Sequence, residues 1–166
     1  MDIVLDSSSI INLINGDCID KILSLDTHKF FIGDQILEQE ILDDLQKTIL
    51  EAFIAMNKIV LLKALVTVSD IITHQKKHKL GLGETECMVI CKATGYTLCS
   101  DDLKARTCSE LELSKKRVVG TLFLLRECVL NQIIECREAV ASYNLMIKKG
   151  GFLPRDFDVR YFCPKI

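Results

Sequence analysis

The chain has 166 residues, of which 49% are hydrophobic and 27% are charged, and its formal net charge is −2. This length and composition predict one compact domain, residues 1–166, with a substantial core. The slightly negative charge excludes a protein that coats nucleic acid by charge alone, but it is compatible with an acidic metal site. Because no apolar run approaches the roughly 20 residues that span a bilayer, and no basic signal region begins the chain, we expect a cytoplasmic protein without a membrane segment.

Eight cysteines are spread through apolar, periodic segments rather than spaced as a disulfide framework. We therefore expect reduced cysteines in the core. Cys87 and Cys91 have the i, i+4 spacing that places two thiols on one helical face, yet no CxxC pair or nearby histidine completes a zinc site. His74 and His78 also share a helical face without a third ligand close in sequence, so we expect exposed side chains there.

The first half of the chain predicts alternating strands and helices. A short apolar strand at residues 2–5 is followed by a polar turn, Asp6 to Ser9, of the kind that caps a helix. The remaining predicted elements are helices at 10–15 and 19–25, a strand at 29–32, a long helix from 34 to 54, a strand at 66–68 within the ambiguous stretch 59–68, and a helix at 70–79.

The stretch from Gly81 to Asp102 predicts a capped helix, a glycine turn and a short strand that ends in two carboxylates. Glu84 and Glu86 lie in the expected first helical turn, where negative charge is favourable. Gly95 fits the end of the helix, and residues 96–99 fit a strand. Beyond it, the sequence predicts helices at 103–110, 122–130 and 135–147, a short strand at 117–119, and a tail at 152–166 whose aromatic residues are expected to cover the core.

Acidic residues fall at the ends of predicted elements: Asp6 after the first strand, Glu84 at a helix start, and Asp101 with Asp102 after a later strand. In a parallel sheet, the carboxyl ends of the strands meet at one edge. Converging carboxylates repel one another unless a hard divalent cation lies between them, and all-oxygen ligands favour Mg²⁺ or Mn²⁺. Such an ion supports phosphodiester hydrolysis. Any one of these acids alone is adequately explained as a cap.

Motifs for other enzyme classes are absent from the sequence: it has no GxxxxGK[ST] loop, no GxSxG elbow and no HExxH pair. A phosphate-accepting aspartate in a receiver-like domain would also use clustered acids. That hypothesis is disfavoured because no lysine follows a late strand in the expected arrangement.

Five segments together resemble the PIN domain (PilT N-terminal) nuclease family, and most closely the branch of the virulence-associated protein C type toxins. The segments are DSSSIINLI at 6–14, ILEQEI at 36–41, LGLGETECMVICKA at 80–93, LCSDDLKAR at 98–106 and VVGTLFLLRECV at 118–129. The resemblance spans nearly the whole chain. It implies a three-layer α/β/α fold with a mostly parallel central sheet.

The resemblance also implies a metal site, carried over position by position. Asp6 matches the first family acid, Glu40 best matches the second with Glu38 as the alternative register, and Glu84 stands where many members have aspartate. Asp101 and Asp102 cover the last acid, and either could be the ligand. Ser8 and Ser100 match hydroxyl positions beside the acids, although turn and cap roles fit them equally well. Lys104 and Arg106 are the substrate-binding candidates.

From this resemblance we expect a Mg²⁺- or Mn²⁺-dependent endoribonuclease that acts on RNA. It further implies a toxin controlled by a small antitoxin protein, and a homodimer. The alternative is a catalytically idle PIN-like module that binds RNA or protein, which the presence of the acids disfavours.

Overall fold

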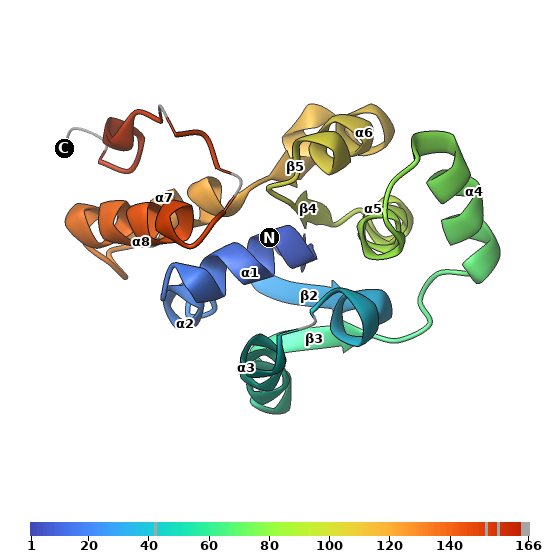
Figure 1. Ribbon diagram of the computed structural model, residues 1–166, viewed down its shortest axis with the longest axis horizontal. Helices are drawn as coiled ribbons and strands as arrows, with labels where there is room; N and C mark the ends of the chain where they lie inside the picture. The colour runs from blue at the N-terminus through green and yellow to red at the C-terminus, as the bar shows by residue number, and fades with distance from the viewer. Residues whose placement is uncertain (42, 152, 156, 164–166) are drawn as a thin grey trace.

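One parallel β-sheet with helices on both faces forms the centre of the protein (Figure 1). The computed structural model describes residues 1–41, 43–151, 153–155 and 157–163. The strands are β1 (Asp2–Leu5), β2 (Lys29–Gly33), β3 (Ile59–Leu62), β4 (Thr97–Cys99) and β5 (Val118–Val119). Their spatial order is β3-β2-β1-β4-β5, and each neighbouring pair is parallel. The predicted α/β fold is therefore confirmed.

The helices form two groups around this sheet. Helix α5 packs against β1, β2 and β4 and contacts α4 and α6, whereas α1, α2, α7 and α8 contact one another. In Figure 1 the first group lies to the right and α7 with α8 lies to the left. The bounds are α1 (Ser7–Asn15), α2 (Ile19–Ile22), η1 (Ile36–Glu40), α3 (Asp44–Ala55), α4 (Val68–His78), α5 (Leu82–Thr94), α6 (Leu103–Leu113), η2 (Lys115–Arg117), α7 (Thr121–Leu130), α8 (Cys136–Lys148) and η3 (Val159–Tyr161).

The sheet reverses its direction of growth at β1. The chain proceeds from β1 outward to β2 and β3, then returns to β4 on the other side of β1. Ile3, Val4 and Leu5 are fully buried, as a central strand covered on both faces requires. Leu5 pairs with Cys99, so the residues after β1 and β4 emerge side by side. Crevices at such reversal points are the usual ligand sites of parallel sheets.

The predicted long helix from 34 to 54 is wrong, because the chain leaves the helical path at Ile41. A single turn of π-helix, η1, ends at Glu40, and Ile41 has an extended backbone. Helix α3 then begins anew, with the Asp43 side chain accepting a hydrogen bond from the Gln46 N–H (2.9 Å). The apolar spacing continues through both helices, so periodicity alone did not reveal the break.

The predicted strand at 66–68 is also wrong, since the strand in this stretch is β3 at Ile59–Leu62. Thr67 caps α4 instead, with its hydroxyl oxygen accepting a hydrogen bond from the Asp70 N–H (3.1 Å). Val68 starts that helix with its side chain largely exposed. The capping geometry at Thr67 outweighs the weak β preference of three branched residues.

The cysteines and the tail follow the predictions in part. Six cysteines are free, and five of these are buried. Cys136 and Cys163, however, form a disulfide between the start of α8 and the tail. Phe162 is fully buried in the core and Phe157 packs against it, as predicted for the aromatic residues of the tail, whereas Tyr161 is exposed. Phe152 lies outside the described residues. No helix within the described part of the chain has the length and apolarity to cross a membrane.

Candidate active site

Asp6 lies at the carboxyl end of β1 and is almost completely buried. Its Oδ1 caps α1 by accepting a hydrogen bond from the Ser7 N–H (2.8 Å). Its Oδ2 accepts hydrogen bonds from the hydroxyls of Ser8 (2.9 Å) and Ser100 (2.7 Å). Burial raises the pKa of Asp6 to about 6, although both hydroxyls act to lower it. The predicted cap role of Asp6 is therefore confirmed, and the metal role of the same carboxylate stays a prediction.

Glu40 reaches the same place from η1. Its Oε2 accepts a hydrogen bond from the Ser7 hydroxyl (2.6 Å), and its Oε1 accepts one from the Gly83 N–H (2.8 Å). The approach to Gly83 depends on the missing side chain, because a Cβ there would lie 2.4 Å from the Glu40 Cδ. Glu38, the alternative register, is exposed. The geometry therefore favours Glu40 as the second acid.

Glu84 lies in the first turn of α5. Its Oε2 accepts a hydrogen bond from the N–H of Gly81, the N-cap residue of the helix (2.8 Å). Burial raises the pKa of this carboxyl, and the charges of Asp102 and Glu40 raise it further. The negative charges of Asp102 and Glu40 therefore disfavour ionisation of Glu84.

Asp101 is oriented by α1 and α7. Its Oδ2 accepts hydrogen bonds from the Asn12 amide (2.8 Å) and the Thr121 hydroxyl (2.8 Å), and its Oδ1 accepts one from the Thr121 N–H (2.9 Å). The Asp101 N–H in turn donates to the Ser8 hydroxyl (3.0 Å). Ser8 therefore ties the acid after β1 to the acid after β4.

Asp102 caps α6, with its Oδ1 accepting a hydrogen bond from the Ala105 N–H (2.7 Å). Its own N–H donates to the Ser100 hydroxyl (3.3 Å). Asp102 and Asp101 are both only partly buried and both face the cavity described next, so the geometry gives each of them access to a ligand.

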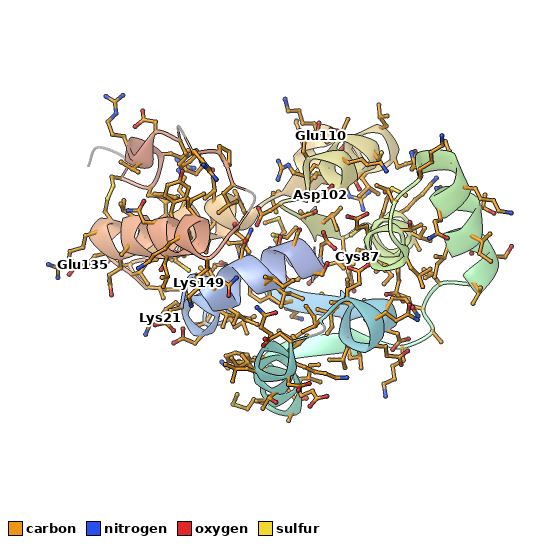
Figure 2. The ribbon with its side chains drawn as sticks, in the orientation of Figure 1. Lys21, Cys87, Asp102, Glu110, Glu135 and Lys149 are labelled. Carbon is orange, nitrogen blue, oxygen red and sulfur yellow. A yellow bond between two sulfur atoms is a disulfide. The ribbon has the colours of Figure 1, made fainter. Side chains whose placement is uncertain are left out.

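A cavity of about 310 Å³ lies at this edge of the sheet. Asp102 and Lys149, which Figure 2 labels, come from opposite groups of helices and both line it. Its walls are Ser7, Ser8, Ile11, Asn12, Asn15, Glu84, Asp101, Asp102, Lys149, Gly150 and Gly151.

Neither of the two predicted substrate-binding residues lines this cavity. Arg106 donates to the Ser100 carbonyl (3.0 Å) and lines a second cavity of about 830 Å³, which shares Asp101 with the first. Lys104 is exposed, donates to the Lys79 carbonyl and lowers the pKa of Glu84 by its charge. The cation that lines the acidic cavity itself is Lys149, which sequence reasoning missed.

The charge at this edge of the sheet fits a hydrated divalent cation. None of Asp6, Glu40, Glu84, Asp101 and Asp102 takes part in a salt bridge with another residue of the described structure. Their oxygens nevertheless form no compact set of three; in the described residues the one set with ligand atoms within 4.8 Å of one another is His74, His78 and Glu112. Mg²⁺ retains several waters and needs only one or two direct carboxylates, which suits this spacing.

Sequence reasoning missed the residues that hold the acids in place. Ser7 bridges Asp6 and Glu40, while Asn12 and Thr121 hold Asp101. Two features of the sequence could have indicated these residues. Asn12 follows Ser8 by one helical turn, which places both on the same face of the helix, and Thr121 belongs to the VVGT segment.

Glu86 binds the backbone at the start of η1. It is buried, and its Oε2 accepts a hydrogen bond from the Gln35 N–H (2.9 Å). Burial raises the pKa of this carboxyl to about 7. A Cβ on Gly33 would lie 2.1 Å from the same oxygen, so the glycine makes room for the acid.

A protein-family model described as a PIN domain matches residues 2–159. The chain therefore belongs to the PIN domain family, in agreement with the parallel sheet and the acids at its edge. No curated protein and no solved structure matches the sequence significantly.

Proposed function

We propose that this PIN domain is a metal-dependent endoribonuclease. The observation that carries the proposal is a group of carboxylates without salt bridges among the described residues. Glu84, Asp101 and Asp102 line the cavity, and Ser7, which also lines it, binds both Glu40 and the buried Asp6. Membership of the PIN domain family supports it, because such domains are typically metal-dependent nucleases. Asp6 and Asp101 lie at the sheet-reversal point, where parallel sheets usually bind their ligands.

The residues of the site have distinct roles in this proposal. Asp6, Glu40, Glu84 and Asp101 or Asp102 would hold Mg²⁺ or Mn²⁺ directly or through water. When bound, the ion lowers the pKa of a coordinated water and offsets charge on the phosphodiester. Ser8 and Ser100 fix the orientation of Asp6 by donating to its Oδ2.

Three basic residues would contact different phosphates of the RNA. Lys149 lines the acidic cavity and would contact the phosphate nearest the acids. Arg106 and Lys104 do not line this cavity and would contact the flanking RNA strand. Three separated cations suit a local phosphate track, in keeping with the slightly negative net charge of the chain.

We further propose that the protein is a toxin of the virulence-associated protein C type, restrained by a small antitoxin, and that it forms a homodimer in the cytoplasm. The support is the resemblance of residues 98–106 and 118–129 to that branch. The test is co-purification: the toxin hypothesis expects a genetically neighbouring small protein that suppresses RNA cleavage when added back.

The nuclease is tested with Asp6→Asn and with the matched control Asp20→Asn, which changes an exposed aspartate on α2. Mn²⁺ is titrated calorimetrically into each protein, and each is incubated with mixed cellular RNA. We expect metal binding and cleavage in the wild type and the control, and loss of both in Asp6→Asn. Full cleavage by folded Asp6→Asn would refute the assignment.

One observation favours a second function, a catalytically idle module that binds RNA or protein. The acids are already well supplied with hydrogen-bond donors from the protein itself. This alternative expects wild-type protein that binds RNA with no Mn²⁺ dependence and leaves it intact.

A further inference from the structure

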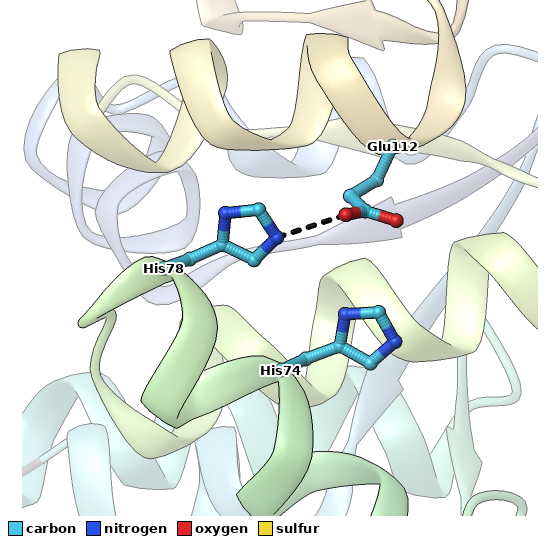
Figure 3. Close-up of side chains that lie close together, drawn as sticks. All are labelled: His74, His78 and Glu112. Atoms are coloured by element: carbon cyan, nitrogen blue, oxygen red, sulfur yellow. Dashed lines mark hydrogen bonds and ion pairs between the residues drawn. The ribbon is translucent and has the colours of Figure 1, made fainter.

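Two histidines and one glutamate meet between α4 and α6. His74 and His78 lie one turn apart on α4, and Glu112 faces them from α6 (Figure 3). One ligand atom from each residue lies within 4.8 Å of the other two. The His78 Nε2 is 2.9 Å from the Glu112 Oε1. The third ligand that the two histidines lacked in the sequence therefore comes from 34 residues farther along the chain.

His74 is available as a ligand. Its Nδ1 is buried and has no hydrogen-bond partner among the described residues. The ring lies nearly parallel to that of His78, with an angle of 5° between the planes and 6.1 Å between the centroids.

We propose that His74, His78 and Glu112 form a binding site for a divalent transition ion of the zinc class. Two imidazoles and one carboxylate, with water as the fourth ligand, are a common donor set for Zn²⁺. Imidazole nitrogen also distinguishes this site from the all-oxygen edge of the sheet, which suits Mg²⁺ or Mn²⁺. The expectation that these histidines are merely exposed is thus corrected by the fold.

Two lysines compete with the ion for Glu112. Lys77 Nζ lies 2.6 Å from its Oε1, and Lys92 Nζ lies 2.7 Å from its Oε2. The Glu112 carboxylate thus has two cationic partners in the protein. The lysine side chains are 61% and 47% exposed, and both can swing into solvent when the ion binds. The lysines therefore weaken the site without blocking it.

A metal here would clamp α4 to α6. His78 is the last residue of α4, and Lys79, whose carbonyl accepts a hydrogen bond from Lys104 of α6, follows it. The chain then passes directly to Gly81 and the Glu84 cap. The ion would thus hold the segment that leads into α5, without contact with the acids themselves.

The test is calorimetric titration of Zn²⁺ into Asp6→Asn protein, a background chosen to weaken metal binding at the sheet edge. We expect one zinc per chain, and at least a tenfold loss of affinity on adding His74→Gln or Glu112→Gln. His28→Gln and Glu110→Gln are the matched controls, since both residues lie outside the cluster. Adding Lys92→Met should raise the affinity about fivefold, because it removes a positive charge worth about 1 kcal/mol at this range in water.

Thermal unfolding without metal shows whether each variant is folded. Glu112→Gln leaves two lysines without their partner and is expected to lower the melting temperature, whereas His74→Gln removes no hydrogen bond seen within the described residues and should not. His74→Gln therefore remains informative if Glu112→Gln unfolds. The proposal is overturned if folded Asp6→Asn protein binds no zinc, or if zinc affinity is unchanged by His74→Gln.

Discussion

Asp6→Asn should stabilise the protein at neutral pH while removing the proposed RNA cleavage. The buried Asp6 carboxyl has its pKa raised from 3.8 to about 6, so the folded state holds this proton more tightly than the unfolded state. Stability from this group is present at low pH and is lost as the pH rises from about 4 to 6. At 1.36 kcal/mol per pKa unit, the full loss is about 3 kcal/mol, and about half of it falls between pH 5 and pH 8.

Asparagine is the right replacement because it fits the hydrogen bonds around position 6. Its Oδ1 can still accept from the Ser7 N–H, and its amide can donate to the hydroxyls of Ser8 and Ser100, which now act as acceptors. The helix cap is therefore kept while the buried charge is removed. Alanine would lose the cap as well and would confuse the two effects.

The assay is urea unfolding of both proteins in EDTA at several pH values between 5 and 8. The carboxyls of Glu84 and Glu86, whose pKa values are also raised, titrate in both proteins. The difference in unfolding free energy between the two proteins therefore reports mainly on Asp6. We expect Asp6→Asn to be more stable by about 3 kcal/mol at pH 8 and by about half of this at pH 5. A difference that is independent of pH, or that favours the wild type at pH 8, would refute the reasoning.

Three further substitutions test how the acids are held. Gly83→Ala should lose about 1–3 kcal/mol of stability by overpacking against Glu40, despite alanine's better helix propensity, and should weaken Mn²⁺ binding; thermal unfolding and calorimetry check this. Thr121→Val removes the hydroxyl that donates a hydrogen bond to Asp101. It should lower the free energy of unfolding in urea by about 1.5 kcal/mol and abolish most RNA cleavage, and unchanged cleavage would contradict the role of Asp101. Lys149→Gln should reduce the slope of log affinity for single-stranded RNA against log salt by about 0.7, whereas an unchanged slope would remove this lysine from the phosphate track.

The sequence was sufficient for the parts of the site that depend on strand order. Asp6 and Asp101 follow apolar strands, and parallel strands that are neighbours bring such residues together. The glycines before Glu84 likewise marked the start of α5. These predictions use only local pattern and the rules of parallel sheets.

The remaining contacts depend on distances that no local pattern contains. Ser7 meets Glu40 across 33 residues, and Asn12 meets Asp101 across 89. The choice between Glu38 and Glu40 depended on the single π-helical turn of η1, which the continuing apolar spacing concealed. Glu112 was overlooked as a partner of the histidines for the same reason, since the packing of α4, α5 and α6 is a tertiary property.

Helix α5 restricts where the chain can change length. Two N–H groups at its start bind Glu84 and Glu40, and Glu86 on the same helix binds the Gln35 N–H. One inserted residue would rotate everything beyond it by about 100°, so an insertion between Gly83 and Glu86 would separate these contacts. Helix α3 contributes no residue to the walls of the acidic cavity among those described. Insertions and deletions among related chains should therefore occur near α3 and not in the first turn of α5.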